Sequence, residues 1–395
     1  MPDTMRRAML RGALGMGTAL GLAPLLARPA LSQGGPAAVP KVGGVAATAI
    51  PEFRVDPFWP KPLPNNWMIG AVAGVAVDKR DHIWIVQRPG TIAQRQLMAE
   101  RSPPETSCCV RAPSVLVFDK QGNVLRHWGG PGQGYEWPEV EHGIYVDAKD
   151  FVWLAGSGPK DHQLLKFTLD GQFVMQIGRS GQSKGNSDTA NLNRPADVEV
   201  DTEAQEVYVA DGYGNRRVIV FDSETGAYKR HWGAYGQAPV DGGPEAYGGT
   251  AAYTPGQPPS RQFASPVHCV RLTKDRQVYV CDRTNDRYQV FRRDGSFVAE
   301  YFIAPQTRLN GSVADLIPSL DPSQEFLFSV DNSNGVARVI RRRDGEVLST
   351  FGRPGRWAGQ FHVPHNIAQD SEGSLYITEV DNGQRVQRFV RHAPS

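Results

Sequence analysis

The chain contains 395 residues, of which 40% are hydrophobic, and it includes 42 glycines and 30 prolines. This composition is typical of a loop-rich globular protein and excludes a disordered chain. The 43 Lys and Arg residues nearly balance the 41 Asp and Glu residues, and the net charge of +2 argues against a dedicated nucleic-acid surface. We therefore expect no nucleic-acid partner.

Residues 1–32 have the pattern of an export signal. A charged start with Arg6 and Arg7 precedes an apolar stretch, and Ala30 and Ser32 mark a small-x-small cleavage site after Ser32. The adjacent arginines resemble a twin-arginine signal, and ordinary secretion is the alternative. Residues 33–50 are rich in Gly, Ala and Pro and indicate a flexible leader. No other apolar run approaches the roughly 20 residues that span a bilayer, so we expect an exported, periplasmic protein without a membrane span.

Residues 51–392 carry six copies of one pattern with a period of about forty residues. Each copy has an apolar strand, a turn, a second strand and then a segment of the type V-x-x-F-D-x-x-G. Such short β-rich units predict an all-β, six-bladed β-propeller with four-stranded blades. The sixth copy stops after its third strand, so we expect the N-terminal segment "EFRVDPFWP" to supply the missing strand and close the ring. The copies begin at Gly74, His142, Ala196, His268, Ala314 and His365.

Histidine occupies one repeat position in alternate copies. Alternate blades of a six-bladed ring are separated by about 120°, so three imidazoles would converge on one point of the axis. Three protein ligands that leave positions open are the arrangement of catalytic zinc. The sequence therefore predicts a metal site formed by His142, His268 and His365. Counted five residues back from the turn residue, the six equivalent positions are Ala73, His142, Ala196, His268, Leu316 and His365.

Two arginines and a tyrosine are predicted on the same face as these histidines. The second strand of a blade runs antiparallel to the first, so its end returns to the histidine side. Arg88 and Arg283 stand just past that strand in the first and fourth copies, which are opposed across the ring, and Tyr213 lies one step beyond it in the third. Inward-facing guanidiniums suit a carboxylate ligand.

Four cysteines are present, too few for a disulfide-built scaffold. Cys269 and Cys281 flank a predicted hairpin turn and should face each other, either as a cross-strand disulfide or as buried thiols. The adjacent pair Cys108 and Cys109 lies in an insertion, and the sequence does not indicate its state.

With these residues placed, the chain resembles the NHL-repeat propeller of peptidyl-α-hydroxyglycine α-amidating lyase. The resemblance covers essentially the whole propeller and is strongest in "RPADVEVD…VYVADGYGNRR", "PVHCVRL…VYVCDR" and "VPHNIAQDSEGSLYI". It implies an NHL-type fold and assigns three kinds of role. The zinc ligands would be His142, His268 and His365, the catalytic tyrosine Tyr213, and the substrate arginines Arg88 and Arg283.

The resemblance also implies a calcium site, with one departure. The family's two carbonyl ligands fall on Val75 and Ile144, and its Asp ligand falls on Asn366. An amide oxygen can bind Ca²⁺ but contributes no charge, so the expected affinity is lower.

The activity implied is that of a zinc-dependent carbon–nitrogen lyase. The substrate would be a small molecule or peptide that carries a carboxylate and ends in an N-substituted α-hydroxyglycine, and the products would be an amide and glyoxylate. Zinc would act as a Lewis acid on the substrate hydroxyl, and Tyr213 would take its proton. Three alternatives stay open: a ureidoglycolate-type lyase, a metal-dependent hydrolase or lactonase, and a non-enzymatic exported propeller that binds a protein or carbohydrate.

Overall fold

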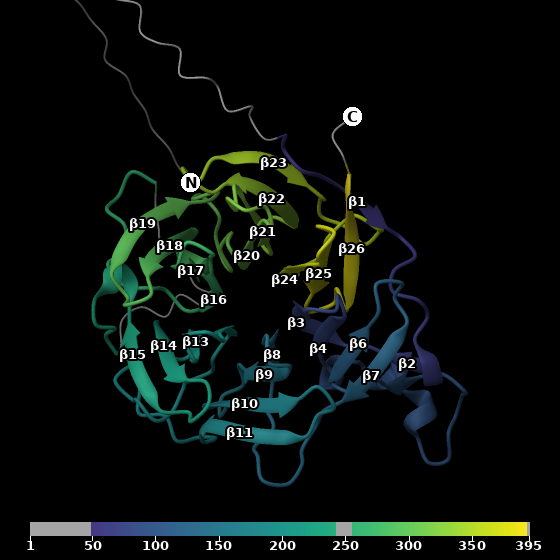
Figure 1. The fold of residues 1–395 in the computed structure, drawn as a ribbon. Coiled ribbons are helices and arrows are strands. Elements are labelled where there is room, and N and C mark those ends of the chain that lie inside the picture. Colours follow the sequence, from purple (N-terminus) through teal and green to yellow (C-terminus); the bar gives the residue numbers. More distant parts are fainter. Residues whose placement is uncertain (1–48, 242–254, 393–395) are drawn as a thin grey trace, which may run out of the picture. The chain divides into compact units, whose positions relative to one another are not determined.

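The computed structural model describes residues 49–241 and 255–392. Six four-stranded antiparallel sheets are arranged around a common axis (Figure 1). This arrangement confirms the prediction of an all-β, six-bladed propeller. The predicted signal peptide, residues 1–32, lies outside the described residues, as does nearly all of the predicted leader, residues 33–50.

Each blade consists of strands that follow one another in the chain, except that β5 lies between β4 and β6 of blade 1 and the N-terminal strand joins blade 6. In Figure 1 the first strands β3, β8, β16, β20 and β24 lie nearest the centre of the ring. The strands are, in blade 1, β3 (Ala71–Val77), β4 (Ile83–Arg88), β6 (Val115–Phe118) and β7 (Val124–Trp128); in blade 2, β8 (Glu141–Val146), β9 (Phe151–Gly156), β10 (Gln163–Thr168) and β11 (Phe173–Gly178); in blade 3, β12 (Asp197–Asp201), β13 (Glu206–Asp211), β14 (Arg217–Asp222) and β15 (Tyr228–Trp232); in blade 4, β16 (Val267–Leu272), β17 (Gln277–Asp282), β18 (Arg287–Arg292) and β19 (Phe297–Phe302); in blade 5, β20 (Asp315–Pro318), β21 (Phe326–Asp331), β22 (Val336–Arg341) and β23 (Val347–Phe351); and in blade 6, β24 (Pro364–Gln369), β25 (Leu375–Glu379), β26 (Arg385–His392) and β1 (Glu52–Asp56).

Blade 6 is closed by the N-terminal strand, as the sequence predicted. Strand β1 pairs antiparallel with β26 over its whole length, from Glu52 opposite His392 to Asp56 opposite Arg388. The two ends of the propeller therefore belong to one sheet, which leaves no gap in the ring.

The remaining elements are short. Strands β2 (Trp67–Met68) and β5 (Val110–Arg111) form a small parallel pair outside the blades. None of the helices in the described part of the chain is long and apolar enough to cross a membrane. These 3-10 helices are η1 (Pro64–Asn66), η2 (Pro89–Thr91), η3 (Gln94–Gln96), η4 (Met98–Glu100), η5 (Ala234–Gly236) and η6 (Arg283–Asn285).

An Asp side chain organises the first turn in several blades. In blade 1, Asp78 Oδ1 accepts the amides of Arg80 and His82, and Asp78 Oδ2 accepts Trp84 Nε1 at 3.1 Å. Asp147 in blade 2 makes the corresponding contacts, including one from Trp153 Nε1 at 2.9 Å. The same side chain thus satisfies turn amides and fixes the aromatic ring of the second strand, which explains why Asp recurs at this position.

Blade 5 departs from the register inferred from the sequence. The residue at the turn position is Ser319, whose amide donates to Phe326 O at 2.8 Å. In blade 1 the corresponding bond joins the amide of Asp78 to His82 O and closes a shorter turn. This turn is longer, and the sequence count started from Asp321 inside it. The position equivalent to the histidines is therefore Ala314 and not Leu316.

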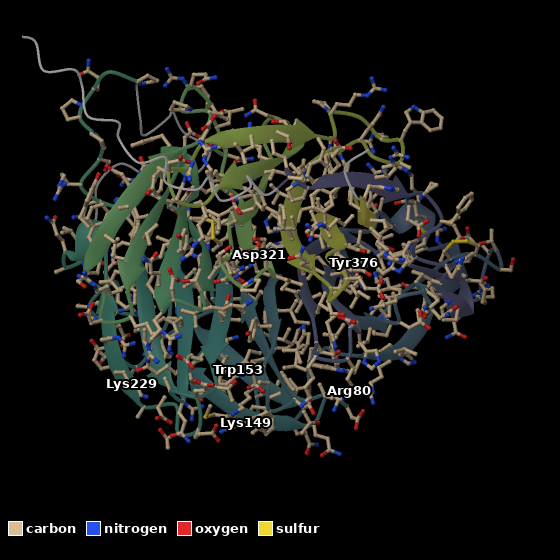
Figure 2. All side chains as sticks on the ribbon, turned by 45° about the horizontal axis from the view of Figure 1, so that its top comes forward. Arg80, Lys149, Trp153, Lys229, Asp321 and Tyr376 are labelled. Carbon is tan, nitrogen blue, oxygen red and sulfur yellow. A yellow bond between two sulfur atoms is a disulfide. The ribbon has the colours of Figure 1, made fainter. Side chains whose placement is uncertain are left out.

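The hydrophobic core lies between the blades and not on the axis. Trp84, Val86 and Val117 of blade 1, for example, pack against Ile144 and Leu165 of blade 2. Comparable clusters occupy the other interfaces between neighbouring blades, and Figure 2 shows side chains filling the spaces between the sheets. Because the stability of the ring comes from these interfaces, the axis is available for polar groups.

Cys269 and Cys281 lie opposite each other on β16 and β17 and form a disulfide. This is the first of the two alternatives that the sequence left open. Cys108 and Cys109 are also joined to each other, within the insertion of blade 1.

Candidate metal centre

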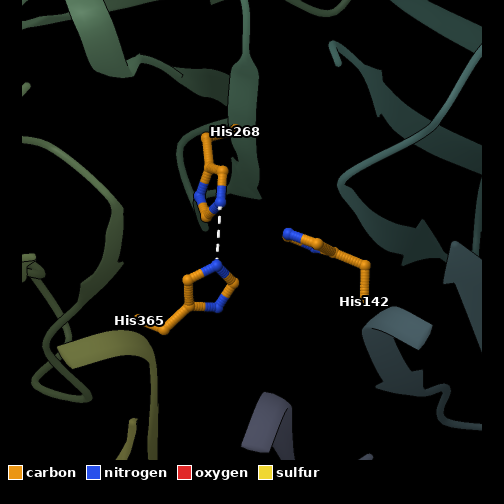
Figure 3. Close-up of side chains that lie close together, drawn as sticks. All are labelled: His142, His268 and His365. Atoms are coloured by element: carbon orange, nitrogen blue, oxygen red, sulfur yellow. Dashed lines mark hydrogen bonds between the residues drawn. The ribbon is translucent and has the colours of Figure 1, made fainter. Parts of the chain in front are cut away.

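The structure brings together the three histidines that the repeat singled out. His142 on β8, His268 on β16 and His365 on β24 are each at most 3% exposed, and one ligand nitrogen from each lies within 4.8 Å of the others. The three rings converge from three sides (Figure 3). Their common position on the first strand of blades 2, 4 and 6 produces this convergence.

Each histidine is fixed by the next blade in the ring. The Nδ1 atoms of His142, His268 and His365 lie 2.6, 2.5 and 2.7 Å from the carbonyl oxygens of Ala196, Ala314 and Ala73, respectively. A carbonyl can only accept, so each Nδ1 carries the proton and each Nε2 keeps its lone pair. The alanines occupy the histidine position in the other three blades, so the same repeat position supplies both the ligand and its support. A ring nitrogen held in this way is typical of metal-ligating histidines.

The surroundings keep these imidazoles neutral. Burial, with contributions from neighbouring cationic groups, lowers the pKa of His142 and of His268 well below the ordinary value. Burial, followed by Arg88 and Arg283, lowers the pKa of His365 to about 3. Neutral imidazole is the form that binds a metal, so no proton competes at neutral pH.

The arrangement of the Nε2 atoms fits a bound cation. His268 Nε2 lies 3.2 Å from His365 Nε2, and with both Nδ1 atoms protonated this contact joins two lone pairs. Two acceptors at this distance repel each other unless a positive charge lies between or beside them. Tetrahedral zinc with Zn–N bonds of about 2.0–2.1 Å would separate its nitrogens by about 3.3 Å. The three histidines therefore form a candidate metal site that zinc fits.

Tyr213 lies directly at this site. Its hydroxyl oxygen is 3.0 Å from His142 Nε2 and 3.2 Å from His268 Nε2. Arg283 Nη1 donates to the same hydroxyl at 3.3 Å. The tyrosine that the sequence selected thus shares one small volume with two of the histidines and one of the arginines.

Two glycines explain how the tyrosine reaches the axis. A Cβ on Gly212 would lie 1.9 Å from Val267 O, and a Cβ on Gly214 would lie 2.1 Å from the side chain of Asn193. Only glycine allows the loop to pass so close to blade 4 on one side and to the preceding loop on the other. Tyr213 can therefore occupy this position only because glycine stands on both sides of it in the chain.

The two predicted arginines lie on the same side of the ring as the tyrosine. Arg88 ends β4, and its Nε donates to Glu141 O at 2.7 Å, beside the strand that carries His142. Arg283 begins η6 and is 2% exposed, with its guanidinium carbon 5.7 Å from the centre of the Tyr213 ring.

The calcium site stays a prediction: Asn366 Oδ1 has no hydrogen-bond partner in the described part of the chain, but the site lies beside a cation that the chain itself supplies. Asn366 donates its amide Nδ2 to Asp315 Oδ2 at 2.9 Å, and the same oxygen receives Arg271 Nη2 at 2.8 Å. Arg271 also lines the cavity of about 270 Å³ that is lined by Val75 and Ile144. Ca²⁺ affinity depends on the number of charged ligands, and here the carboxylate next to the site is already paired with a fixed cation. We therefore assign no step to calcium.

One residue near the site, Arg194, was not predicted from the sequence. The guanidinium carbon of Arg194 lies 5.8 Å from the centre of the Tyr213 ring, on the strand-free segment that precedes β12. This segment lies outside the repeated unit, so comparison of the copies could not identify it.

Comparison with known proteins agrees with the fold and with the repeat. No family model matches the chain. NHL repeat-containing protein 3 of Mus musculus is 28% identical over 360 residues, which cover 86% of this chain and 84% of that protein. Peptidyl-alpha-hydroxyglycine alpha-amidating lyase 1 of Drosophila melanogaster is 26% identical over 356 residues, which cover 85% of this chain and 59% of that protein.

A solved structure from Bacteroides thetaiotaomicron, of a protein of unknown function, matches with a TM-score of 0.50 and 16% identity over 82% of this chain and 70% of that one, and it shows the fold alone. The relatives named as amidating lyases support a lyase-like function at low identity. The homologues of this chain thus include peptidyl-α-hydroxyglycine α-amidating lyases and NHL repeat-containing proteins, as the repeats indicated.

Proposed function

We propose that this protein is a zinc-dependent lyase that cleaves the C–N bond of an N-substituted α-hydroxyglycine and releases an amide and glyoxylate. The observation that carries the proposal is the contact of the Tyr213 hydroxyl with His142 Nε2 and His268 Nε2 at 3.0 and 3.2 Å. A hydroxyl that can exchange a proton lies beside two of the three neutral imidazoles that fit a metal. A structural metal ion on the propeller axis would not need such a group.

The side chains divide the reaction between them. Zinc held by His142, His268 and His365 would supply Lewis acidity at the substrate hydroxyl. Tyr213, as phenolate, takes the proton of that hydroxyl, and the O–H electron pair becomes the second bond of the new carbonyl group. The C–N bonding pair leaves with the nitrogen, and the proton that Tyr213 removed is passed to this nitrogen, which completes the amide and returns Tyr213 to the phenolate. Positive charge from Arg283, whose Nη1 is 3.3 Å from the phenol oxygen, favours the phenolate.

Arg88 and Arg283 hold the substrate in place. Both lie on the side of the ring where Tyr213 meets the histidines, and a planar guanidinium binds a carboxylate through two parallel hydrogen bonds. The carboxylate of the α-hydroxyglycine unit is therefore their proposed ligand. The same groups would accept ureidoglycolate, which is also an α-hydroxyglycine derivative.

A non-catalytic propeller is the second candidate. NHL repeat-containing protein 3 and the Drosophila lyase match nearly the same share of this chain. The name of the first of these proteins states no enzymatic activity. In that case the histidine site would bind a structural metal, and the exposed face would bind a protein or carbohydrate.

We also propose that the protein is exported to the periplasm. The support is the signal-like sequence of residues 1–32 together with the Cys269–Cys281 disulfide, which an oxidising compartment maintains.

The direct test measures glyoxylate release from α-hydroxyhippurate and related α-hydroxyglycines by zinc-loaded protein. Tyr213→Phe should lower kcat by about 10²- to 10⁴-fold, the usual contribution of a positioned acid–base group, with zinc content unchanged. Tyr228→Phe on exposed β15 is the matched control and should keep the parental rate. Parental turnover by the Tyr213→Phe protein would remove the tyrosine from the mechanism. Absence of glyoxylate from every α-hydroxyglycine tested would replace the lyase with the binding propeller.

A further inference from the structure

A third arginine, Arg194, extends the set of cations around the site. Its Nε donates to Ser157 O at 2.9 Å. Ser157 directly follows β9 in blade 2, the place that Arg88 takes at the end of β4 and Arg283 takes after β17. Blade 2 has Ser157 at this repeat position instead of an arginine. Arg194, in the segment before β12, places a guanidinium next to it.

Arg194 and Tyr213 are fixed to each other. The amide of Tyr213 donates to Arg194 O at 3.1 Å, and the amide of Gly214 donates to Asn193 O at 3.0 Å. The guanidinium carbons of Arg194 and Arg283 lie 5.8 and 5.7 Å from the centre of the Tyr213 ring. The Tyr213 ring therefore has two guanidiniums close to it. The backbone of Tyr213 is also hydrogen-bonded to the backbone of Arg194.

The backbone of Arg194 has an uncommon conformation. Its φ is 59°, in the left-handed region that few residues other than glycine adopt. The conformation is held by the amide of Arg194, which donates to Asp161 O at 2.7 Å, and by the bond from Tyr213. Such conformations persist where the surrounding structure fixes them, and they concentrate at functional sites.

Two of these arginines, Arg88 and Arg194, are not paired with a carboxylate of the described chain. The fully buried Arg217 and Arg287 are paired with Asp211 and Asp282, both at 2.8 Å, whereas Arg88 and Arg194 are half-buried. Within residues 49–241 and 255–392, Arg88 and Arg194 make no ion pair with a carboxylate, and each binds a backbone carbonyl through Nε instead. With a metal cation on three neutral histidines, one substrate carboxylate would leave positive charge uncompensated.

We propose that Arg194 determines specificity by binding a second anionic group on the N-acyl side of the substrate, as an acidic residue before the α-hydroxyglycine would provide. This inference rests on the proposed lyase function. Arg88 and Arg283 hold the carboxylate of the α-hydroxyglycine unit, and Arg194, on the blade 2 side of Tyr213, receives the second carboxylate.

The test compares two substrates of nearly equal shape, N-acetyl-glutamyl-α-hydroxyglycine and N-acetyl-glutaminyl-α-hydroxyglycine, with the zinc-loaded protein. The parent should prefer the glutamyl substrate by about tenfold or more in kcat/KM, as expected for a charge-assisted hydrogen bond. Arg194→Gln should bring this ratio to about one, because only the glutamyl substrate loses a charged partner. Arg194→Lys should keep part of the preference, since it keeps the charge but not the planar fork.

The control Arg179→Gln removes the same charge from an exposed position near blade 2 and should leave the ratio unchanged. Partial unfolding of a variant cannot move the ratio, because it lowers both rates equally. Equal rates for the two substrates in the parent, or a preference that persists in Arg194→Gln, would overturn the role of Arg194 while the lyase stands. Release of glyoxylate from neither substrate, nor from α-hydroxyhippurate, would overturn the lyase and this inference with it.

Discussion

Two neighbouring layers along the axis of the propeller handle charge in opposite ways. In the histidine layer, His142, His268 and His365 are neutral, and their Nε2 atoms converge without a positive group among them. Three residues further along β16 from His268, Arg271 places its guanidinium between Asp197 of blade 3 and Asp315 of blade 5. The first layer is built to receive a cation from solution, whereas the second contains its own.

The second layer, called the Arg271 layer below, places three carboxylates around one guanidinium. Glu199 joins Asp197 and Asp315 around the one guanidinium, at 4.0 Å from Arg271 Nη1. Burial raises the pKa of Glu199 to about 7 and that of Asp315 to about 6, with Arg271 opposing both shifts. Removing one member of such a buried cluster leaves the others uncompensated, which makes the layer sensitive to single substitutions.

One repeat position serves separate purposes in alternate blades. Where blades 2, 4 and 6 carry histidine, blades 1, 3 and 5 carry Ala73, Ala196 and Ala314, whose carbonyls accept the Nδ1 protons. The residue after Ala196 and the residue after Ala314 are the aspartates that hold Arg271. Blades 3 and 5 therefore support both layers, through a carbonyl in the first and a carboxylate in the second.

The largest expected effect comes from breaking the histidine layer. His268→Ala should lose stoichiometric zinc after dialysis and lower kcat by roughly 10³-fold or more, since the charge stabilisation supplied by the metal is lost. Elemental analysis and glyoxylate release measure the two effects. His127→Ala, on the exposed face of β7, is the control and should keep both. Full zinc in a protein with all three histidines replaced would place the metal elsewhere.

Breaking the Arg271 layer should affect stability and spare the metal. Arg271→Met leaves two buried aspartates facing each other, and we expect the free energy of unfolding to fall by about 3–5 kcal/mol. Chemical denaturation measures this change, and elemental analysis should find parental zinc. Arg80→Gln, which removes an exposed ion pair with Asp150, should leave the transition close to that of the parent.

A combined variant tests whether unpaired carboxylates cause the loss of stability in Arg271→Met. Adding Asp197→Asn and Asp315→Asn to Arg271→Met removes the two carboxylates that bind the guanidinium directly and should restore part of the lost stability. If the triple variant is less stable than Arg271→Met alone, the cost does not come from unpaired carboxylates.

The sequence predicted those features that the repeat itself encodes. The six blades, the closing strand and the convergence of three histidines all follow from local pattern and ring geometry. The register of blade 5 was wrong because its first turn is longer, which hid Ala314 as the partner of His268. Arg194 lies outside the repeated unit. The Arg271 layer joins residues of blades 3, 4 and 5, and no single copy of the repeat contains it.

The smallest effect concerns Glu199 and the pH dependence of stability. Its pKa is about 7 in the folded protein and near 4.5 when unfolded, so between these values the folded state holds a proton that the unfolded state has released. Glu199 therefore stabilises the fold below pH 4.5, and this contribution, up to about 3 kcal/mol, is lost as the pH rises to 7. Glu199→Gln cannot ionise, so from pH 5 to pH 7.5 its free energy of unfolding should rise relative to that of the parent. Denaturant titrations at the two pH values measure this difference, from which the contribution of the distant His365 cancels. A constant difference would mean that Glu199 is already ionised at pH 5 and that Arg271 compensates all three carboxylates of its layer.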